Sequence, residues 1–286
     1  VLDDDGNLVQ DKTLVLDEWK KHFSRLYEIK PYTEYDDQHL KNIQLKLKDD
    51  IESKNGDIAS LNQPITIGEV QKAVLKAKLN KAYGIDEIPA EVLKNELCIS
   101  LLHKIISLSF EQGIVPSAWR KGIIQPLPKC ASNDPRILGN YRGITLISVP
   151  CKIYCSILNT RLSYWIEENK LLVEEQNGFR KDRSCIDHLH TLYNVLSIQN
   201  SKKRSAFVCY VDARRAFDNI SRDCLWYKLQ TIWVKGRMLS AIQSLYQDVE
   251  CAVRVNGSLT EWFKVPNGLN TATKLCWVNS ELVLYS

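Results

Sequence analysis

The 286-residue sequence predicts an α+β fold, because long stretches of helical periodicity are joined to a few short strand patterns. A chain of this length supports one large domain or two modest ones, and it buries a sizeable core. Neither internal repeats nor low-complexity tracts interrupt the pattern.

The N-terminal part begins with an Asp-Gly turn between apolar residues, which predicts an exposed hairpin over residues 1–10. Apolar side chains then recur at helical spacing between Leu16 and Leu26 and predict an amphipathic helix. The polar stretch 30–64 that follows is predicted to be a loosely ordered connector.

The central part is predicted to be mainly helical. Thr66 and Glu69 have the spacing of a capping box, so a helix should begin there and continue to residue 79. Apolar stripes predict three more helices, over 101–110, 150–169 and 184–199. Prolines at 116, 126 and 128 confine residues 122–127 to a short strand or an edge segment.

The C-terminal part mixes strands and helices. The apolar run 206–211 predicts a strand that ends at Asp212, and Ser221 is placed to cap a helix. A further helix is predicted around 238–245. Residues 249–255 then alternate in polarity before Asn256-Gly257, which predicts a hairpin whose second strand passes through Val265.

The composition, with 44% hydrophobic and 25% charged residues, is that of an ordinary soluble globular protein. No apolar run approaches the roughly 20 residues that a membrane-spanning helix needs. The nine cysteines form no disulfide framework or zinc pattern, which indicates reduced thiols and an intracellular, cytoplasmic or nuclear, location.

Charge is distributed unevenly along the chain. The net charge is +4 overall, but it is −5 over residues 1–60 and +7 over residues 120–218. Basic side chains in the middle are interleaved with Trp119, Tyr141 and Phe179, a combination suited to phosphate contacts and base stacking. They are Arg120, Lys121, Lys129, Arg136, Arg142, Arg180, Lys181 and Arg183. An aromatic core beside a solvated surface explains the same pattern equally well.

Asp212 is the carboxylate with the most specific setting. An acid at the end of an apolar strand lies at the rim of a sheet, where it binds a cation or accepts backbone hydrogen bonds. Phosphoryl transfer to nucleotides uses Mg²⁺ held by carboxylate and phosphate oxygens, so Asp212 is a candidate ligand. Asp218 has the simpler reading of a helix cap or turn residue.

Five runs of sequence together resemble one family. They are KAYGIDEIPAEVLK (81–94), PSAWRKGIIQPLPK (116–129), NYRGITLISVPCKIYCSILNTRL (140–162), EEQNGFRKDRSCIDHL (174–189) and YVDARRAFD (210–218). In order and approximate spacing they resemble the reverse transcriptase of non-LTR (LINE-type) retrotransposons. The resemblance covers most of residues 1–269 and is highly specific.

The resemblance implies a right-hand polymerase fold, with mostly helical fingers and an incomplete antiparallel palm sheet. Residues 1–60 correspond to a linker after an endonuclease domain that is missing here, and residues 61–205 to the fingers. Residues 206–286 correspond to a partial palm, with an aberrant tail from about residue 270. The implied activity is RNA-directed DNA polymerisation, a nucleotidyl transfer that uses Mg²⁺, an RNA template, a DNA primer and dNTP.

The resemblance also implies roles for single residues. Asp212 corresponds to the first catalytic, metal-binding Asp of the palm, with the Ala213 carbonyl beside it. Phe217 corresponds to the aromatic residue that excludes a ribose 2′-hydroxyl. Arg142 corresponds to the fingers Arg that contacts the incoming triphosphate, where a planar donor fork suits phosphate. Arg180 is a weaker candidate for a template or nucleotide contact.

The sequence departs from the family pattern near its end. Thr271 and Ala272 stand where the family has Gln-Gly, and the Tyr-x-Asp-Asp strand that supplies the other metal ligands is missing, as is the thumb. We therefore expect a fragment that synthesises no DNA by itself, with a poorly packed C-terminal tail. The alternatives are a non-catalytic RNA-binding module and a decayed gene product without function.

Overall fold

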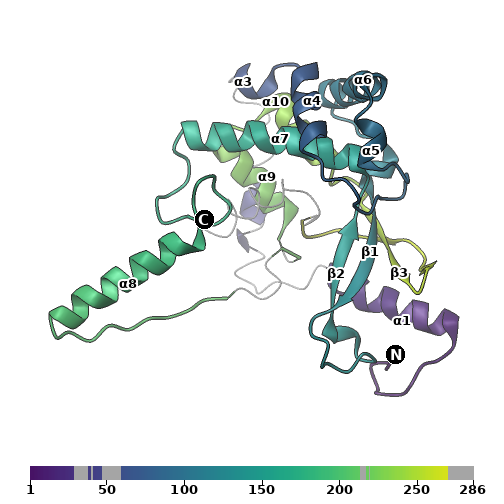
Figure 1. Cartoon of the computed structure of the whole chain (residues 1–286), viewed down its shortest axis with the longest axis horizontal. Helices are drawn as coiled ribbons and strands as arrows, with labels where there is room; N and C mark the ends of the chain where they lie inside the picture. Colours follow the sequence, from purple (N-terminus) through teal and green to yellow (C-terminus); the bar gives the residue numbers. More distant parts are fainter. Residues whose placement is uncertain (29–37, 40, 47–58, 213–216, 219, 270–286) are drawn as a thin grey trace.

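The computed structural model describes residues 1–28, 38–39, 41–46, 59–212, 217–218 and 220–269. In this part of the chain a small sheet lies between helix α1 and a larger body of helices, and helix α8 projects away from that body (Figure 1). This arrangement confirms the predicted α+β class.

The helices and strands follow the chain in this order. The helices are α1 (Lys12–Ser24), α3 (Ala59–Asn62), α4 (Ile67–Lys76), α5 (Ala90–Leu93), α6 (Glu96–Gln112), α7 (Val149–Glu168), α8 (Cys185–Ser201), α9 (Arg222–Thr231) and α10 (Gly236–Ser244). Short 3₁₀ turns lie at η1 (Ser117–Arg120) and η2 (Leu138–Asn140). The strands are β1 (Lys121–Pro128), β2 (Tyr141–Leu146), β3 (Glu250–Val255), β4 (Ser258–Leu259) and β5 (Phe263–Lys264).

The sheet is mixed. Strand β1 pairs with β2 in the antiparallel sense and with β3 in the parallel sense, while β4 and β5 pair antiparallel with β3. The resemblance implied an incomplete antiparallel palm sheet, and the parallel pair of β1 with β3 departs from it. The hairpin after β3 is confirmed: Asn256 and Gly257 both have positive φ, as a tight two-residue turn requires.

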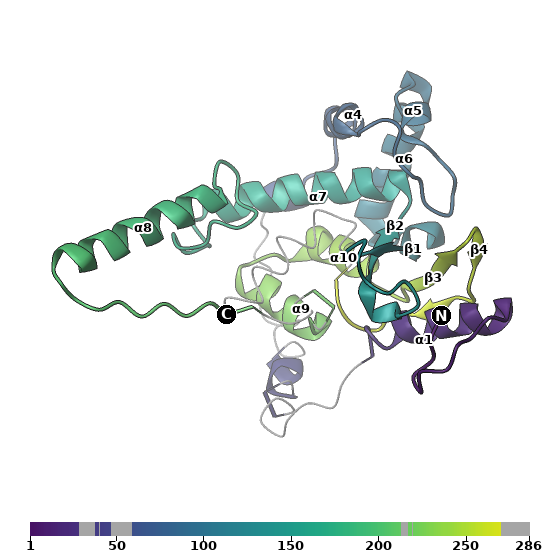
Figure 2. The ribbon, with the colours of Figure 1, turned by 60° about the horizontal axis from the view of Figure 1, so that its bottom comes forward.

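Helix α1 covers one face of the sheet, where Trp19 and Phe23 join the second of two hydrophobic cores (Figure 2). The Asp11 side chain caps the helix by accepting hydrogen bonds from the Thr13 and Leu14 amides. Before it, a bridge between Leu2 and Leu8 confirms the predicted hairpin.

The larger core belongs to the helical body, in which α7 packs against α4 and α3. Ten residues of α7 are buried, eight of them in its first ten residues, so the N-terminal half of the helix is the more enclosed one. The helices predicted from 66, 101, 150, 184, 221 and 238 are all present. The helix predicted over 101–110 begins earlier, at Glu96, and the others begin within about two residues of the predicted start.

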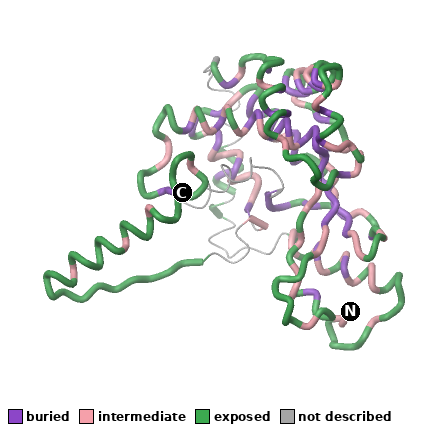
Figure 3. Tube along the Cα trace, viewed as in Figure 1, coloured by how far each residue is buried: buried purple, intermediate pink, exposed green. Residues whose placement is uncertain are grey.

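Residues 204–212 form no strand, so the strand predicted at 206–211 is wrong. The physical reason lies in β3, because β1 occupies one of its edges and β4 and β5 occupy the other. Phe207 is 98% exposed and Val211 is 90% exposed. Helix α8 likewise has no buried residue, so the segment 185–212 is a projecting arm (Figure 3).

Much of the predicted connector 30–64 lies outside the described residues. Its described portion is helical at 41–46 and in α3, so that portion is more ordered than predicted. The poorly packed tail predicted from about residue 270 also lies outside the described residues. Among the helices that are described, none has both the length and the apolar character needed to cross a bilayer.

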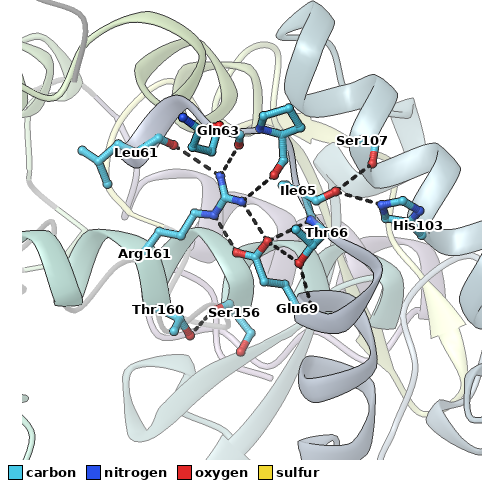
Figure 4. Close-up of polar contacts among 11 residues, drawn as sticks. Leu61, Gln63, Ile65, Thr66, Glu69, His103, Ser107, Ser156, Thr160 and Arg161 are labelled. Carbon is cyan, nitrogen blue, oxygen red and sulfur yellow. Dashed lines mark hydrogen bonds and ion pairs between the residues drawn. The ribbon is translucent and has the colours of Figure 1, made fainter. Parts of the chain in front are cut away.

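One guanidinium group joins α7 to α4 and to the segment before α4 (Figure 4). Arg161 donates to both carboxylate oxygens of Glu69, at 2.7 and 2.8 Å, and to the carbonyl oxygens of Gln63 and Pro64, at 2.6 and 3.0 Å. Glu69 also accepts from the Thr66 amide, which completes the predicted capping box. This Arg161–Glu69 clamp fixes the angle between α4 and α7.

Arg161→Ala is expected to lower the free energy of unfolding by about 3 kcal/mol, because it leaves a partly buried carboxylate without its cation. Urea denaturation followed by circular dichroism measures the change. Arg136→Ala is the matched control, because its exposed pair with Asp134 should contribute no more than about 0.5 kcal/mol. Equal losses in the two variants would contradict the structural role of the clamp.

The clamp should also be sensitive to acid. Burial alone would raise the pKa of Glu69, but hydrogen bonds from Arg161 and Thr66 outweigh it and hold the pKa below its ordinary value of 4.5. The stabilisation is therefore complete above that value and is lost as the pH falls through the lower, folded-state pKa. In Glu69→Gln this part of the acid dependence should disappear.

Candidate functional site

Asp212 lies at the end of the projecting arm and is exposed to solvent. Among the described residues it makes no hydrogen bond or ion pair, and no group of three or more His, Cys, Asp or Glu side chains gathers to hold a metal ion. Ala213, whose carbonyl was predicted to lie beside this carboxylate, falls outside the described residues.

Phe217 and Asp218 dock against the turn that follows β5. The Leu269 amide donates to the Phe217 carbonyl at 3.0 Å, and the Gly268 amide donates to the Ile220 carbonyl at 3.0 Å. Gly268 has φ of +78°, and a Cβ at this position would lie 2.7 Å from the Asp218 carbonyl oxygen. Glycine is therefore needed here both for the backbone conformation and for the close approach.

Arg222 holds the same turn from the other side. Its guanidinium donates to the carbonyl oxygens of Gly268 at 3.1 Å, Tyr246 at 2.9 Å and Asn267 at 3.4 Å, and it stacks over the Tyr246 ring at 5.2 Å. Burial lowers the pKa of Arg222. The planar fork of arginine reaches the three carbonyls through three separate nitrogens, Nε, Nη1 and Nη2, in one fixed plane.

Tyr27 connects this cluster to the N-terminal helix. Burial and the neighbouring Asp218 carboxylate both raise the pKa of the Tyr27 hydroxyl, while a hydrogen bond with the Thr145 side chain opposes them. Burial also raises the pKa of the nearby Cys251 thiol on β3 to about 12. Tyr27, which follows α1, thus lies close to the half-buried Asp218 and to side chains on β2 and β3.

Arg142 lies on β2, opposite Leu127 of β1, and its side chain is exposed. Of the eight basic residues singled out from the sequence, seven make a hydrogen bond or ion pair within the described part of the chain. Arg142 makes none there. The solvated-surface interpretation therefore fits the seven, and Arg142 remains as the side chain free to meet a phosphate.

Arg180 is used within its own loop. It forms a two-pronged pair with Glu167, at 3.0 and 2.9 Å, and donates to the carbonyl oxygens of Val173 and Gln176. Its side chain is 10% exposed. These bonds fasten the loop 171–180 to the end of α7, and no bond among the described residues joins Arg180 to Arg142 or Asp212.

A family model described as "Reverse transcriptase (RNA-dependent DNA polymerase)" matches residues 127–278, more than half of the chain. The matched range includes Arg142, Asp212, Phe217 and the turn at Gly268. The chain belongs to the reverse transcriptase family.

Curated relatives of the chain come from transposons and retrotransposable elements. It is 25% identical over 202 residues to the transposon TX1 uncharacterized 149 kDa protein of Xenopus laevis, covering 70% of this chain and 15% of that protein. It is 24% identical over 200 residues to the probable RNA-directed DNA polymerase from transposon BS of Drosophila melanogaster, covering 68% and 22%. For the Pol polyprotein of retrotransposable element R2 of Popillia japonica the identity is 24% over 214 residues, covering 74% and 29%.

The chain thus spans less than a third of the length of the relatives it matches. These findings confirm the predicted resemblance to reverse transcriptases of non-LTR retrotransposons. They assign no role to any single residue, so the roles of Asp212, Ala213, Phe217, Arg142 and Arg180 stay predictions.

The sequence did not point to Tyr27 or Arg222, which complete the surroundings of Phe217 and Asp218 in this reverse transcriptase chain. The sequence held one signal for Arg222. It is the first residue of α9, where a positive charge is unfavourable next to the positive end of the helix dipole, so an arginine at this position suggests that other groups bind its side chain. Tyr27 follows an amphipathic helix and carries no comparable signal, because its partners are more than a hundred residues away.

Gly268→Ala, compared with a glycine in open space, should show how much of the loss of stability comes from the contact with Asp218 and how much from the positive φ. The positive φ alone should cost about 1–2 kcal/mol, and the contact with Asp218 should add about 1–3 kcal/mol more. Gly257→Ala is the control, since Gly257 has φ of +80° but open space around its Cα. Equal losses of unfolding free energy in urea would show that the contact with Asp218 contributes nothing.

Proposed function

We propose that this chain is the fingers and partial palm of an RNA-directed DNA polymerase from a non-LTR retrotransposon. In this proposal it binds RNA and an incoming nucleotide but does not synthesise DNA alone. The fingers comprise residues 61–205 and the partial palm residues 206–286. It would act on an RNA template, a DNA primer and dNTP inside the cell.

The observation that carries the proposal is the docking of Phe217 and Asp218 onto the turn at Gly268. Both segments belong to the range matched by the reverse transcriptase family model. Their contact, held by Arg222, gives Phe217 a fixed backbone position. A ring that excludes a 2′-hydroxyl by steric contact needs such a fixed position.

Magnesium fits this part of the chain only incompletely. Asp212 offers one exposed carboxylate of the right chemistry, but the described residues add no cluster of carboxylates around it. Mg²⁺ is held by oxygen ligands in near-octahedral geometry, and two-metal nucleotidyl transfer needs several carboxylates. The proposal therefore assigns Asp212 as one metal ligand and derives no catalytic step through the metal.

The purified chain should give no template-dependent product in a primer-extension assay with an RNA template, a DNA primer, dNTPs and Mg²⁺. The physical reason is that a single carboxylate holds the metal weakly and provides no second metal site. Gel analysis of the labelled primer measures the outcome. Extension by the wild-type chain that disappears in Asp212→Asn would refute the inactivity and strengthen the polymerase assignment.

Arg142 and Arg180 should respond differently to removal. Arg142→Ala is expected to weaken binding of a deoxynucleoside triphosphate about tenfold, the effect of losing one charge-assisted hydrogen bond, with an unchanged melting temperature. Arg180→Ala should instead lower the melting temperature, because four hydrogen bonds that anchor the loop 171–180 are lost.

Isothermal titration calorimetry in Mg²⁺ buffer and differential scanning calorimetry make this comparison. Arg136→Ala is the control for general loss of charge near the β1–β2 hairpin, because Arg136 is exposed and paired with Asp134. If Arg136→Ala and Arg142→Ala weakened nucleotide binding equally, the specific role of Arg142 would be excluded.

A further inference from the structure

A cavity of about 280 Å³ lies beside the N-terminal end of α7, away from Phe217 and Gly268. Its floor is apolar and small: Ala73, Ala77, Ala82, Ala90, Val149 and Ile153, with Ser156 at one side. Its remaining lining residues are four lysines, Lys76, Lys78, Lys81 and Lys152. We call this feature the lysine pocket. It is at the small end of ligand cavities, which span ~300–1,000 Å³.

The loop 77–88 is fixed against α7, so the lysines are placed by the fold. A Cβ at Gly84 would lie 2.3 Å from the Ser148 amide nitrogen, and only glycine permits this approach. Ser148 donates from its hydroxyl to the Asp86 carboxylate at 2.5 Å, which ties the loop to the residue that caps α7. The Asn80 amide also donates to Glu91 at 2.6 Å.

The residues that line this pocket include four lysines and no carboxylate. None of the four lysines makes an ion pair within the described part of the chain, and Lys76, Lys78 and Lys81 are exposed. Lys152 is half-buried, and burial lowers its pKa although Cys151 and the Asp86 carboxylate nearby oppose the change. The N-terminal end of α7 adds the positive end of a helix dipole to the same mouth.

These features suit one class of ligand. Four ammonium groups around one opening match a chain of phosphates, because lysine binds phosphate as a point charge. The apolar floor gives no partner to a free phosphate, but it suits the face of one unpaired base. A duplex keeps its bases stacked inside and could place only its backbone at the rim.

We propose that the lysine pocket binds single-stranded RNA, with phosphates on the four lysines and one base against the alanine, valine and isoleucine floor. The choice of RNA rests on the proposed function, in which the chain handles an RNA template. The pocket is distinct from the site around Asp212 and Phe217, so it would hold RNA at a distance from the nucleotide.

Fluorescence anisotropy of a labelled oligouridylate, titrated with the full chain at several salt concentrations, tests the proposal. Lys78→Ala/Lys81→Ala/Lys152→Ala should weaken binding at low salt by at least about tenfold. It should also reduce the slope of log K against log salt by about 2, since each phosphate contact on a single strand contributes about 0.7.

Two control variants separate the effects to be measured. The first tests whether any loss of positive charge weakens binding, and the second tests the cavity itself with its lysines unchanged. Lys12→Ala/Lys104→Ala/Lys264→Ala removes the same charge from exposed residues elsewhere and should leave the affinity within about twofold of wild type. Ser156→Leu fills the cavity without changing the charge. It should weaken binding of the single strand while leaving the salt slope and the binding of duplex RNA unchanged.

The outcomes separate this proposal from the proposed function. Equal losses in the two triple variants, or preferred binding of duplex RNA that Ser156→Leu does not affect, would overturn the lysine pocket as a single-strand site. Displacement of the oligouridylate by equimolar inorganic pyrophosphate would do the same and indicate a small-anion site. Loss of nucleotide binding in Arg142→Ala with RNA binding intact would support the proposed function independently.

Discussion

The Arg161–Glu69 clamp sets the geometry on which the rest of the described fold depends. It fixes α4 against α7, and only two residues separate the end of β2 from the start of α7, so the same contact also influences how the helical body meets the sheet. The turn between β2 and α7 is held in addition by Gly84. Because this turn is short and its backbone is in close contact with Gly84, β2 has little freedom to move relative to α7. The Arg161–Glu69 clamp, which holds α7, therefore also affects the position of β2.

Strand pairing then determines where the metal-binding candidate lies. Strand β3 has neighbours on both edges, whereas within the described residues β2 is paired on one edge only. The arm that ends at Asp212 therefore has no place beside β3, and its apolar side chains stay exposed. The position of Asp212 is therefore a consequence of how the strands of the sheet pair. Because its carboxylate is exposed to water, Asp212 alone should hold a cation only weakly.

Local signals predicted the helices well, because a 3.6-residue apolar period and a capping box such as Thr66 with Glu69 act within a few residues. They failed at 206–211, where an apolar run has strand composition but no neighbouring strand to pair with, and at β2, whose pattern Gly143 interrupts. The candidate site was predictable only as a set of residue types. Arg180 and Arg142 look alike in sequence, and only the fold places Glu167 beside one of them.

Arg142 on β2 and the lysine pocket beside α7 both offer cations without an ion pair among the described residues, and these two places are structurally connected. Arg142 on β2 and Lys152 on α7 lie within one continuous stretch, separated by no more than about 30 Å of strand, turn and helix. The turn between them is the one that Gly84 and Asp86 hold against the loop 77–88. Because a rigid turn joins them, nucleotide contact at Arg142 and strand contact at the lysine pocket are set by one structural element. A substitution that displaces this turn should therefore disturb both surfaces, whereas a change at either cation affects one.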